Sequence, residues 1–431
     1  MVTSNCLLKN EIWLPNMTTL TFLQRRLSKR ISKGSNKLFI PLLFMILSQY
    51  SSLGQSKMEI SSNFPGGNIK VDKIDKDTVW MSPDLRDTEG YWFYWYFKIT
   101  GMAGKTVHFQ FPQKPVFGRY GPAYSINNDS TWKWYGETSY ANHGFTFSFS
   151  KGDTSAYFSI AFPYTQKNLY DFLGKLRNRG SLKLDTLCFS RENRAVEQIH
   201  IMPAQKTLYK VLITARNHAC EMTTDYVLEG IIRSILNERD LQFLRDHVEF
   251  CIVPFVDKDG VENGDQGKWR KPHDYNRDYD NNSIYPIVKA IKAKVPEWSD
   301  GKLKIVLDLH CPYLRGDGDA EYICFIGNKN KAIQQQQLIM SDLVAKNCND
   351  ELRFYGKNFM KYGTLWNTDK NYTQGASCSQ WGTTIPGIAL STTLEFPYAN
   401  ASGIAVSKDN ARMFGGSMAY SIQDYLPSLA K

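Results

Sequence analysis

Residues 208–221 read Leu-Tyr-Lys-Val-Leu-Ile-Thr-Ala-Arg-Asn-His-Ala-Cys-Glu and join two kinds of secondary structure. The apolar and β-branched residues of 208–215 predict a buried strand. After a polar turn that holds His218 and Glu221, apolar side chains recur at helical spacing, at Val227, Leu228, Ile231, Ile232, Ile235 and Leu236. A buried strand that leads through a short turn into an amphipathic helix is the repeating unit of an α/β sheet.

The same alternation continues toward the C-terminus. Further buried strands are predicted at 248–253, 304–309 and 388–394. We therefore expect residues 166–431 to form an α/β domain, with a mixed, largely parallel sheet flanked by helices. Ligands of such sheets bind at the carboxyl ends of the strands, where the loops gather.

Residues 55–165 have a different pattern, in which short aromatic segments alternate with turn residues. Examples are 91–100, 106–111 and 145–149. This spacing predicts an antiparallel β-sandwich that precedes the α/β domain. Because polar alternation is absent from 91–97, we interpret these aromatic residues as core, with a carbohydrate-stacking platform as the alternative.

The first 54 residues predict a secretory signal peptide. Seven basic residues and one glutamate give this segment a net charge of +6, and the apolar residues 38–47 carry no charge. Small residues then lead to a cleavage site near Gly54. The apolar run is too short to span a membrane. We therefore expect an exported protein, periplasmic or extracellular, without a stable membrane span after cleavage; the alternative is an N-terminal membrane anchor.

The composition excludes one class of partner. The 431 residues are 42% hydrophobic, which is enough for a large core. The formal net charge is +10, but the N-terminal 54 residues contribute +6 of it, so the remainder carries only +4. No basic face with interleaved aromatic residues is evident, so we expect no binding to nucleic acid.

Three candidate metal ligands follow predicted strands. His218 and Glu221 lie in the turn after the first of these strands, and His310 directly follows a later one. Catalytic zinc sites commonly use two histidines and one carboxylate, and they leave a fourth position for water. His-x-x-Glu alone is a weak signal, but the order and placement of the three residues strengthen it. They predict a site for one Zn²⁺ per chain, with Glu395 placed after another strand.

The loop between these candidate ligands resembles that of a known family. It reads Val-Pro-Phe-Val-Asp-Lys-Asp-Gly-Val-Glu-Asn-Gly over 253–264 and Gly-Lys-Trp-Arg-Lys-Pro-His-Asp-Tyr-Asn-Arg-Asp-Tyr over 267–279. This resembles the zinc carboxypeptidase family, in which Pro-x-x-Asn-Pro-Asp-Gly-Val precedes an arginine and then Asp-x-Asn-Arg. Asp257-Lys258 stands here in place of the family's Asn-Pro, in a turn that holds no ligand. The resemblance covers residues 166–425.

The resemblance implies roles at the metal site. His218, Glu221 and His310 match the family's three zinc ligands, and Glu395 matches its general base. Asp274 matches the carboxylate that hydrogen-bonds the first histidine ligand and fixes its tautomer.

It also implies roles for substrate binding. Asn276 and Arg277 match the pair that binds a terminal carboxylate. Tyr372 precedes Trp381 by nine residues and looks like the mobile tyrosine that closes over the substrate. The floor of the side-chain pocket is expected at 377–380, Ser-Cys-Ser-Gln, which is small and polar.

One role is less well matched. Arg270 is expected to stabilise the oxyanion, but it lies only six residues before Asn276, which is closer than the family pattern suggests. Lys268 and Lys271 are the alternatives for this cation.

The N-terminal segments narrow the resemblance. Trp-Phe-Tyr at 92–94 and Phe-Pro-Tyr-Thr at 162–165 resemble the β domain that precedes the catalytic domain of cytosolic carboxypeptidases. Those enzymes remove glutamates from acidic protein tails, and an exported relative need not share that substrate.

The predicted function is therefore a zinc-dependent metallocarboxypeptidase that hydrolyses the C-terminal peptide bond of peptides or proteins. One alternative is a zinc amidase that acts on cell-wall peptides or acylated amino acids through the same metal site. The other is a catalytically inactive module that binds a glycan or a protein.

Overall fold

The computed structural model describes residues 57–431 except 113–115, 138–142, 317–319, 350 and 431. The predicted signal peptide, residues 1–54, lies outside this described part. Among the described residues, no helix has both the length and the apolar character that a membrane span requires.

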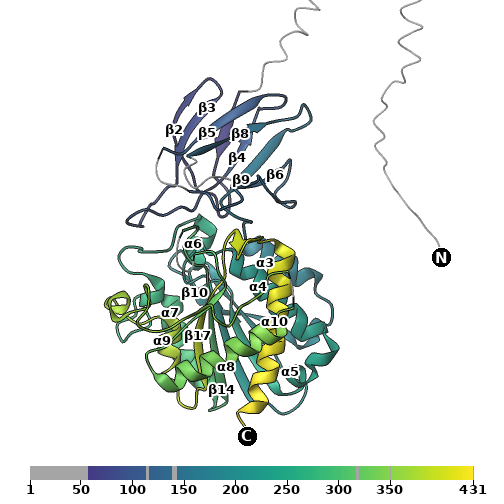
Figure 1. The fold of residues 1–431 in the computed structure, drawn as a ribbon, viewed down its shortest axis with the longest axis vertical. Coiled ribbons are helices and arrows are strands. Elements are labelled where there is room, and N and C mark those ends of the chain that lie inside the picture. Colours follow the sequence, from purple (N-terminus) through teal and green to yellow (C-terminus); the bar gives the residue numbers. More distant parts are fainter. Residues whose placement is uncertain (1–56, 113–115, 138–142, 317–319, 350, 431) are drawn as a thin grey trace, which may run out of the picture. The chain divides into compact units, whose positions relative to one another are not determined.

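The strands between residues 59 and 159 form two sheets (Figure 1). One has the order β1-β4-β9-β6-β7 and the other the order β2-β3-β5-β8. The strand pairs are antiparallel except β3 with β5. The bounds are β1 (Glu59–Ser61), β2 (Lys70–Asp75), β3 (Thr78–Ser82), β4 (Tyr96–Thr100), β5 (Thr106–Gln110), β6 (Ala123–Ile126), β7 (Lys133–Trp134), β8 (Gly144–Ser148) and β9 (Ser155–Ser159).

The aromatic residues of this domain join its two sheets. The ring of Phe109, on β5, lies 5.5 Å from that of Phe97, on β4, and 5.3 Å from that of Phe158, on β9. The predicted antiparallel β domain is confirmed. Residues 93–97 are buried, which confirms their interpretation as core, whereas Tyr91 is 67% exposed.

The strands from β10 to β17 form one eight-stranded sheet, of order β10-β11-β13-β12-β14-β17-β15-β16. The inner run β13-β12-β14-β17 is parallel, and β10, β11 and β15 add antiparallel pairs. This is the mixed, largely parallel sheet that the sequence predicts. Its strands are β10 (Leu182–Phe189), β11 (Ala195–Ile201), β12 (Tyr209–Ala215), β13 (Val248–Val253), β14 (Leu303–His310), β15 (Cys324–Ile326), β16 (Phe359–Met360) and β17 (Leu390–Glu395).

Helices cover both faces of this sheet because alternate residues of its strands point to opposite sides. Val211 and Ile213 pack into one core with residues of α4 and α10, whereas Leu212 packs with α7 and α9. Figure 1 shows α7 and α9 on one side of β10 and β17, with α4 and α10 on the other. The helices are α3 (Gln166–Lys175), α4 (Thr223–Asn237), α5 (Gln242–His247), α6 (Lys258–Asn263), α7 (Pro286–Ser299), α8 (Lys331–Asn347), α9 (Cys378–Gly382) and α10 (Lys408–Ser428).

The strand register aligns three strand ends. Ala215 of β12 lies beside Leu309 of β14, and His310 lies beside Glu395 of β17. Parallel strands end at the same edge of a sheet, so the turns that follow β12, β14 and β17 meet there.

Candidate active site

The three predicted metal ligands meet at this edge. His218 and Glu221 lie in the turn between β12 and α4, and His310 is the last residue of β14. Their ligand atoms all lie within 4.8 Å of one another, and all three residues are buried. Glu221 Oε1 is 2.9 Å from His218 Nδ1, and Glu221 Oε2 is 2.8 Å from His310 Nδ1. The predicted cluster is therefore present.

The turn that presents His218 and Glu221 is held by a buried arginine that we did not identify from the sequence. Arg216 has a positive φ of 57°, which bends the chain sharply after β12. Its side chain donates to the carbonyl of Ala219 at 3.0 Å and pairs with Asp225 of α4 at 2.5 Å. The guanidinium thereby fixes both ends of the ligand-bearing turn.

Each histidine turns its second ring nitrogen toward a carboxylate. His218 Nε2 lies 3.2 Å from Asp274 Oδ1, and His310 Nε2 lies 2.7 Å from Asp308 Oδ2. When Nε2–H donates to the carboxylate, the lone pair of Nδ1 faces the centre of the cluster, as metal-binding histidines require. Two such nitrogens and one carboxylate form a donor set that fits zinc. The predicted contact of Asp274 with the first histidine is present.

Asp308 is a site residue that we did not predict. Its other oxygen, Oδ1, accepts hydrogen bonds from Thr214 Oγ1 at 2.6 Å and from Asn217 Nδ2 at 2.8 Å. The carboxylate is fully buried, and these donors hold it in place against His310. An acidic residue inside the apolar strand 304–309 was the available signal, because such a residue needs buried partners.

The electrostatics favour a bound cation. Burial acts to raise the pKa of Glu221, but Lys268, His218 and His310 outweigh it and hold the pKa well below its usual range. Burial acts the same way on Asp274, and the neighbouring His218 lowers its pKa. Both carboxyl groups are therefore negatively charged at neutral pH.

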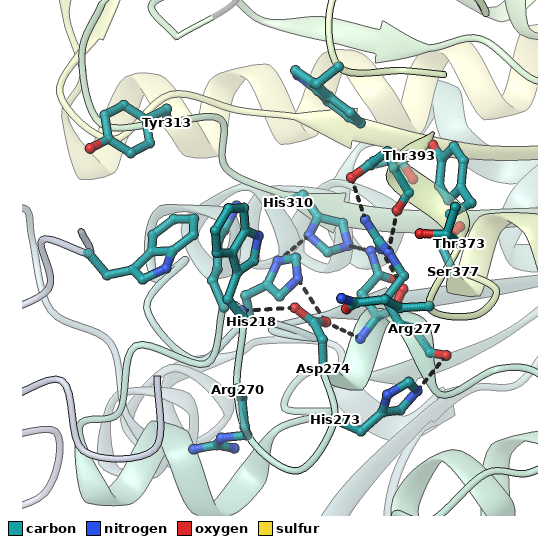
Figure 2. A pocket seen from close by; sticks show the side chains of 18 of the residues that line it. His218, Arg270, His273, Asp274, Arg277, His310, Tyr313, Thr373, Ser377 and Thr393 are labelled. Carbon is teal, nitrogen blue, oxygen red and sulfur yellow. Dashed lines mark hydrogen bonds and ion pairs between the residues drawn. The ribbon is translucent and has the colours of Figure 1, made fainter. Parts of the chain in front are cut away.

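The cluster lies in a cavity of about 820 Å³ (Figure 2). Glu395, the last residue of β17, lines this cavity together with His218 and His310. The side chain of Glu395 is 6% exposed, which limits the access of bulk water to its carboxylate. The structure thus brings the candidate base into the same cavity as the candidate metal ligands.

The loop after α6 delivers the predicted carboxylate-binding pair. The short 3₁₀ helix Tyr275–Arg277 is capped by Asp274, whose Oδ1 accepts from the backbone N–H of Asn276 at 2.7 Å. The Asn276 side-chain oxygen accepts from the N–H of Cys378 at 3.0 Å, and its amide nitrogen lies 3.2 Å from His310 Nε2, beside the metal-ligand cluster. One carboxylate, Asp274, therefore positions both His218 and Asn276.

Arg277 and Tyr372 lie together in the cavity wall. Arg277 donates to the carbonyl of Asn371 at 2.9 Å and to its side-chain oxygen at 3.0 Å. The guanidinium lies 5.2 Å from the ring centroid of Tyr372, whose hydroxyl donates to Asn367 at 3.0 Å. These partners are neutral, so the charge of Arg277 is available to an anionic ligand.

Arg270 does not lie where its predicted role requires. Its guanidinium pairs with Asp87 at 2.7 Å, with Asp257 at 2.5 Å and with Asp265. Figure 2 shows the side chain directed away from His218 and His310. Three carboxylates attract the guanidinium more strongly than the cavity does, so this arrangement does not support the expected contact with an oxyanion.

The cation that lies at the cluster is Lys268. Its Nζ is 2.7 Å from Glu221 Oε1. Burial acts to lower the pKa of this lysine, but Glu221 and Glu395 raise it, so the amine stays protonated. The third basic residue of the loop, Lys271, pairs at 2.5 Å with Glu89, and both side chains are largely exposed.

Of the expected pocket floor at 377–380, Ser377 lines the cavity. Ser377 caps α9 and lines the cavity with Thr393 of β17. Ser379 and Thr393 share a hydrogen bond of 2.9 Å between their hydroxyls. The wall is uncharged and hydroxyl-lined here, as the sequence predicts, and Thr393 is an addition to it.

The fold and the histidine–glutamate–histidine cluster agree with the resemblance to metallocarboxypeptidases. A search of family models then identifies the two parts of the chain. The zinc carboxypeptidase family matches residues 169–298, and the cytosolic carboxypeptidase N-terminal domain matches residues 60–161. The chain therefore contains a zinc carboxypeptidase domain preceded by the N-terminal domain of the cytosolic carboxypeptidases, which confirms the resemblance seen in the sequence.

Known proteins agree with this assignment. Cytosolic carboxypeptidase 3 of Bos taurus is 28% identical over 228 residues, which are 50% of this chain and 22% of that protein. Cytosolic carboxypeptidase 1 of Homo sapiens is 22% identical over 372 residues, which are 73% of this chain and 27% of that protein. The chain thus matches about a quarter of the length of these relatives.

A solved structure shows the same fold. The metallo-carboxypeptidase from Burkholderia cenocepacia superposes with a TM-score of 0.69 at 20% identity, and covers 86% of this chain and 100% of that one. The superposition includes both the β domain and the α/β domain, since it extends over most of the described residues.

Proposed function

We propose that this protein is a zinc-dependent metallocarboxypeptidase that hydrolyses the C-terminal peptide bond of peptides or proteins. One observation carries the proposal. A single cavity is lined by both histidines of the metal-ligand cluster, by Glu395, and by the Asn276–Arg277 pair. A cation site next to an anion-binding pair suits a substrate whose reacting carbonyl lies near a free carboxylate.

The chemistry divides between the metal and the protein. A zinc ion held by His218, Glu221 and His310 would supply a Lewis acid that polarises the carbonyl and lowers the pKa of water. Glu395 accepts the proton of the attacking water and returns it to the leaving amine. Its place beside His310 at the end of β17 supports this role, because the strand pairing holds its backbone rigidly.

The part of the cavity lined by Asn276 and Arg277 binds the C-terminal carboxylate of the substrate. Arg277 binds the carboxylate through charged hydrogen bonds, and the amide nitrogen of Asn276 adds a further donor. Tyr372 lies against the Arg277 guanidinium and closes over the bound residue. The requirement for a free terminal carboxylate makes the enzyme an exopeptidase, since an internal peptide bond has no such group.

The proposal is tested with the zinc-loaded protein and a library of peptides with varied C-terminal residues. Mass spectrometry is expected to find products shortened by one C-terminal residue, and no cleavage of the same peptides with amidated C-termini. Glu395→Gln should retain zinc and lose about 10²–10⁴-fold in rate. Glu297→Gln, at an exposed position of α7, is the matched control. Full activity of Glu395→Gln would refute the mechanism.

The same assay separates the alternatives. Cleavage of cell-wall stem peptides or acylated amino acids, with free C-terminal peptides left intact, would favour a zinc amidase. Binding of a glycan or protein that persists in a His218→Ala/His310→Ala variant, with no hydrolysis of any peptide, would favour an inactive module.

Localisation is a separate proposal. We infer export from residues 1–54 alone, because of their basic segment, apolar segment and small residues. The two relatives described above are named cytosolic carboxypeptidases, so export would place this protein in a different compartment from the one in their names. Cell fractionation with N-terminal sequencing of the mature protein tests it, and a cytosolic protein that retains residues 1–54 would contradict it.

A further inference from the structure

The site loop carries two cations with different surroundings, the buried Arg270 and the half-buried Lys268. Arg270 is enclosed by the carboxylates of Asp87, Asp257 and Asp265. Lys268, two residues earlier, lines the same cavity as Arg270 but pairs with the metal-ligand residue Glu221. A cation that is neutralised by three anions has little charge to offer a substrate, whereas Lys268 shares its charge with the metal-ligand cluster.

Three contacts place the Lys268 ammonium. Nζ lies 2.7 Å from Glu221 Oε1, 3.4 Å from the carbonyl oxygen of Cys311, and 5.5 Å from the ring centroid of Trp92. Its side chain is only 15% exposed, so water screens its charge weakly. The ammonium is therefore held beside the metal-ligand cluster.

Arg270 fixes the loop that makes this possible. The backbone of residues 269–271 pairs with residues 87–89 of the β domain: Lys271 N–H donates to the Asp87 carbonyl at 2.8 Å, and Thr88 forms a bridge with Arg270. The Arg270 side chain joins the same segment to Asp257, the N-cap of α6. Arg270 is thus a positioning residue that acts through the loop.

We propose that Lys268 is the catalytic cation that stabilises the negative charge developing on the oxygen of the scissile carbonyl. This inference rests on the proposed carboxypeptidase function. As the water oxygen bonds to the carbonyl carbon, its proton passes to Glu395 and the carbonyl π electrons move onto the oxygen beside the ammonium. The carbonyl then re-forms, the C–N bond breaks, and the proton from Glu395 goes to the leaving amine. Lys268 remains protonated throughout and transfers no proton.

A different role would leave a different signature. If Lys268 only balances the charge of Glu221 when no metal is bound, its removal changes zinc affinity and leaves turnover of the zinc-loaded enzyme intact. If it stabilises the developing charge, its removal lowers turnover at full zinc occupancy. The two roles are therefore separable by measuring zinc content and kinetics on the same samples.

The experiment compares zinc-loaded Lys268→Met and Lys268→Arg with Lys346→Met. Lys346 offers the control because it is a lysine of α8 that pairs with Asp424, has a side chain that is 70% exposed, and does not line the cavity. We expect Lys268→Met to retain one zinc per chain and to lose about 10²–10³-fold in kcat, the usual effect of removing one oxyanion donor. Lys268→Arg should recover about tenfold or more of that loss, because it restores the positive charge. Lys346→Met should stay within about threefold of the parent.

A binding measurement supports the kinetics and remains informative if turnover is low. A phosphinic peptide has an anionic tetrahedral centre and mimics the developing charge, whereas the amino acid product does not. We expect Lys268→Met to weaken phosphinic peptide binding about tenfold or more, with product binding changed by less than about threefold.

The outcomes distinguish this inference from the proposed function. Zinc-loaded Lys268→Met with kcat near that of an active parent, and with unchanged phosphinic peptide affinity, would overturn the role of Lys268 and leave the carboxypeptidase proposal standing. A zinc-loaded parent that hydrolyses no peptide with a free C-terminus would overturn the proposed function itself.

Discussion

Substitution of Asp308 tests the proposed metal site directly, because this carboxylate contacts the candidate zinc ligand His310. The carboxylate is fully buried and accepts from His310 Nε2 at 2.7 Å, Thr214 at 2.6 Å and Asn217 at 2.8 Å. Asp308→Asn keeps the shape but removes the negative charge that raises the basicity of His310 and selects its tautomer. Loss of such a partner typically weakens metal binding about 10–100-fold. That corresponds to about 1.4–2.7 kcal/mol in zinc-binding free energy.

The assay is competition for zinc between the protein and a chromogenic chelator at neutral pH. Thr214→Val is the first control: it removes one hydrogen bond to Asp308 but leaves the contact with His310, and should weaken zinc binding less. Asp300→Asn is the second, because its carboxylate is 70% exposed and pairs with Lys302 away from the site. If Asp308→Asn binds zinc within about twofold of the parent, the carboxylate does not orient His310, and the argument from its geometry fails.

Three further predictions follow from other contacts. Arg277→Met should raise KM for peptides with free C-termini about 10–100-fold in steady-state assays, from the loss of charged hydrogen bonds, while zinc content stays at one per chain; an unchanged KM would contradict the role of Arg277. Removal of zinc by a chelator should lower the melting temperature, since a ligand at 100 times its Kd stabilises the native state by about 2.7 kcal/mol; an unchanged melting curve would argue against a bound metal. Burial opposes ionisation of Glu249, but the nearby His200, Trp298 and Lys210 lower its pKa from 4.5 to about 2. Its stabilisation is therefore complete above pH 4.5 and is lost as the pH falls toward 2, so the stability difference between the parent and Glu249→Gln in urea unfolding should shrink over that range.

The order of elements in the α/β domain could be predicted because each strand carries its own signal. The apolar segments at 208–215 and 248–253 correspond to β12 and β13 with small shifts at their ends. These strands are buried on both faces, which leaves an almost continuous apolar run in the sequence. The aromatic segment 91–100 was less clear, since only Tyr96–Thr100 forms a strand although 93–97 are buried. Burial could be inferred there, but hydrogen bonding to a neighbouring strand could not.

The metal cluster could be predicted for a related reason. His218, Glu221 and His310 follow strand ends, and parallel strand ends meet in space. Asp308 was missed because its function depends on which face of β14 it occupies and on donors from β12. Neither property is local to residues 304–309.

The sequence could not decide whether Lys268 or Arg270 is the cation beside the metal-ligand cluster. Lys268 and Arg270 have the same charge and lie two residues apart, so residue type and spacing cannot choose between them. The choice depends on Asp87, which lies far away in the sequence, and on Asp257 and Asp265, which together enclose the guanidinium. Asp257 stands where the family has the asparagine of Asn-Pro. The departure from the family pattern therefore supplies one of the carboxylates that hold Arg270. The β domain therefore contributes to the active site by supplying an anion and a backbone pairing that hold the loop, and by leaving Lys268 as the cation at the cluster.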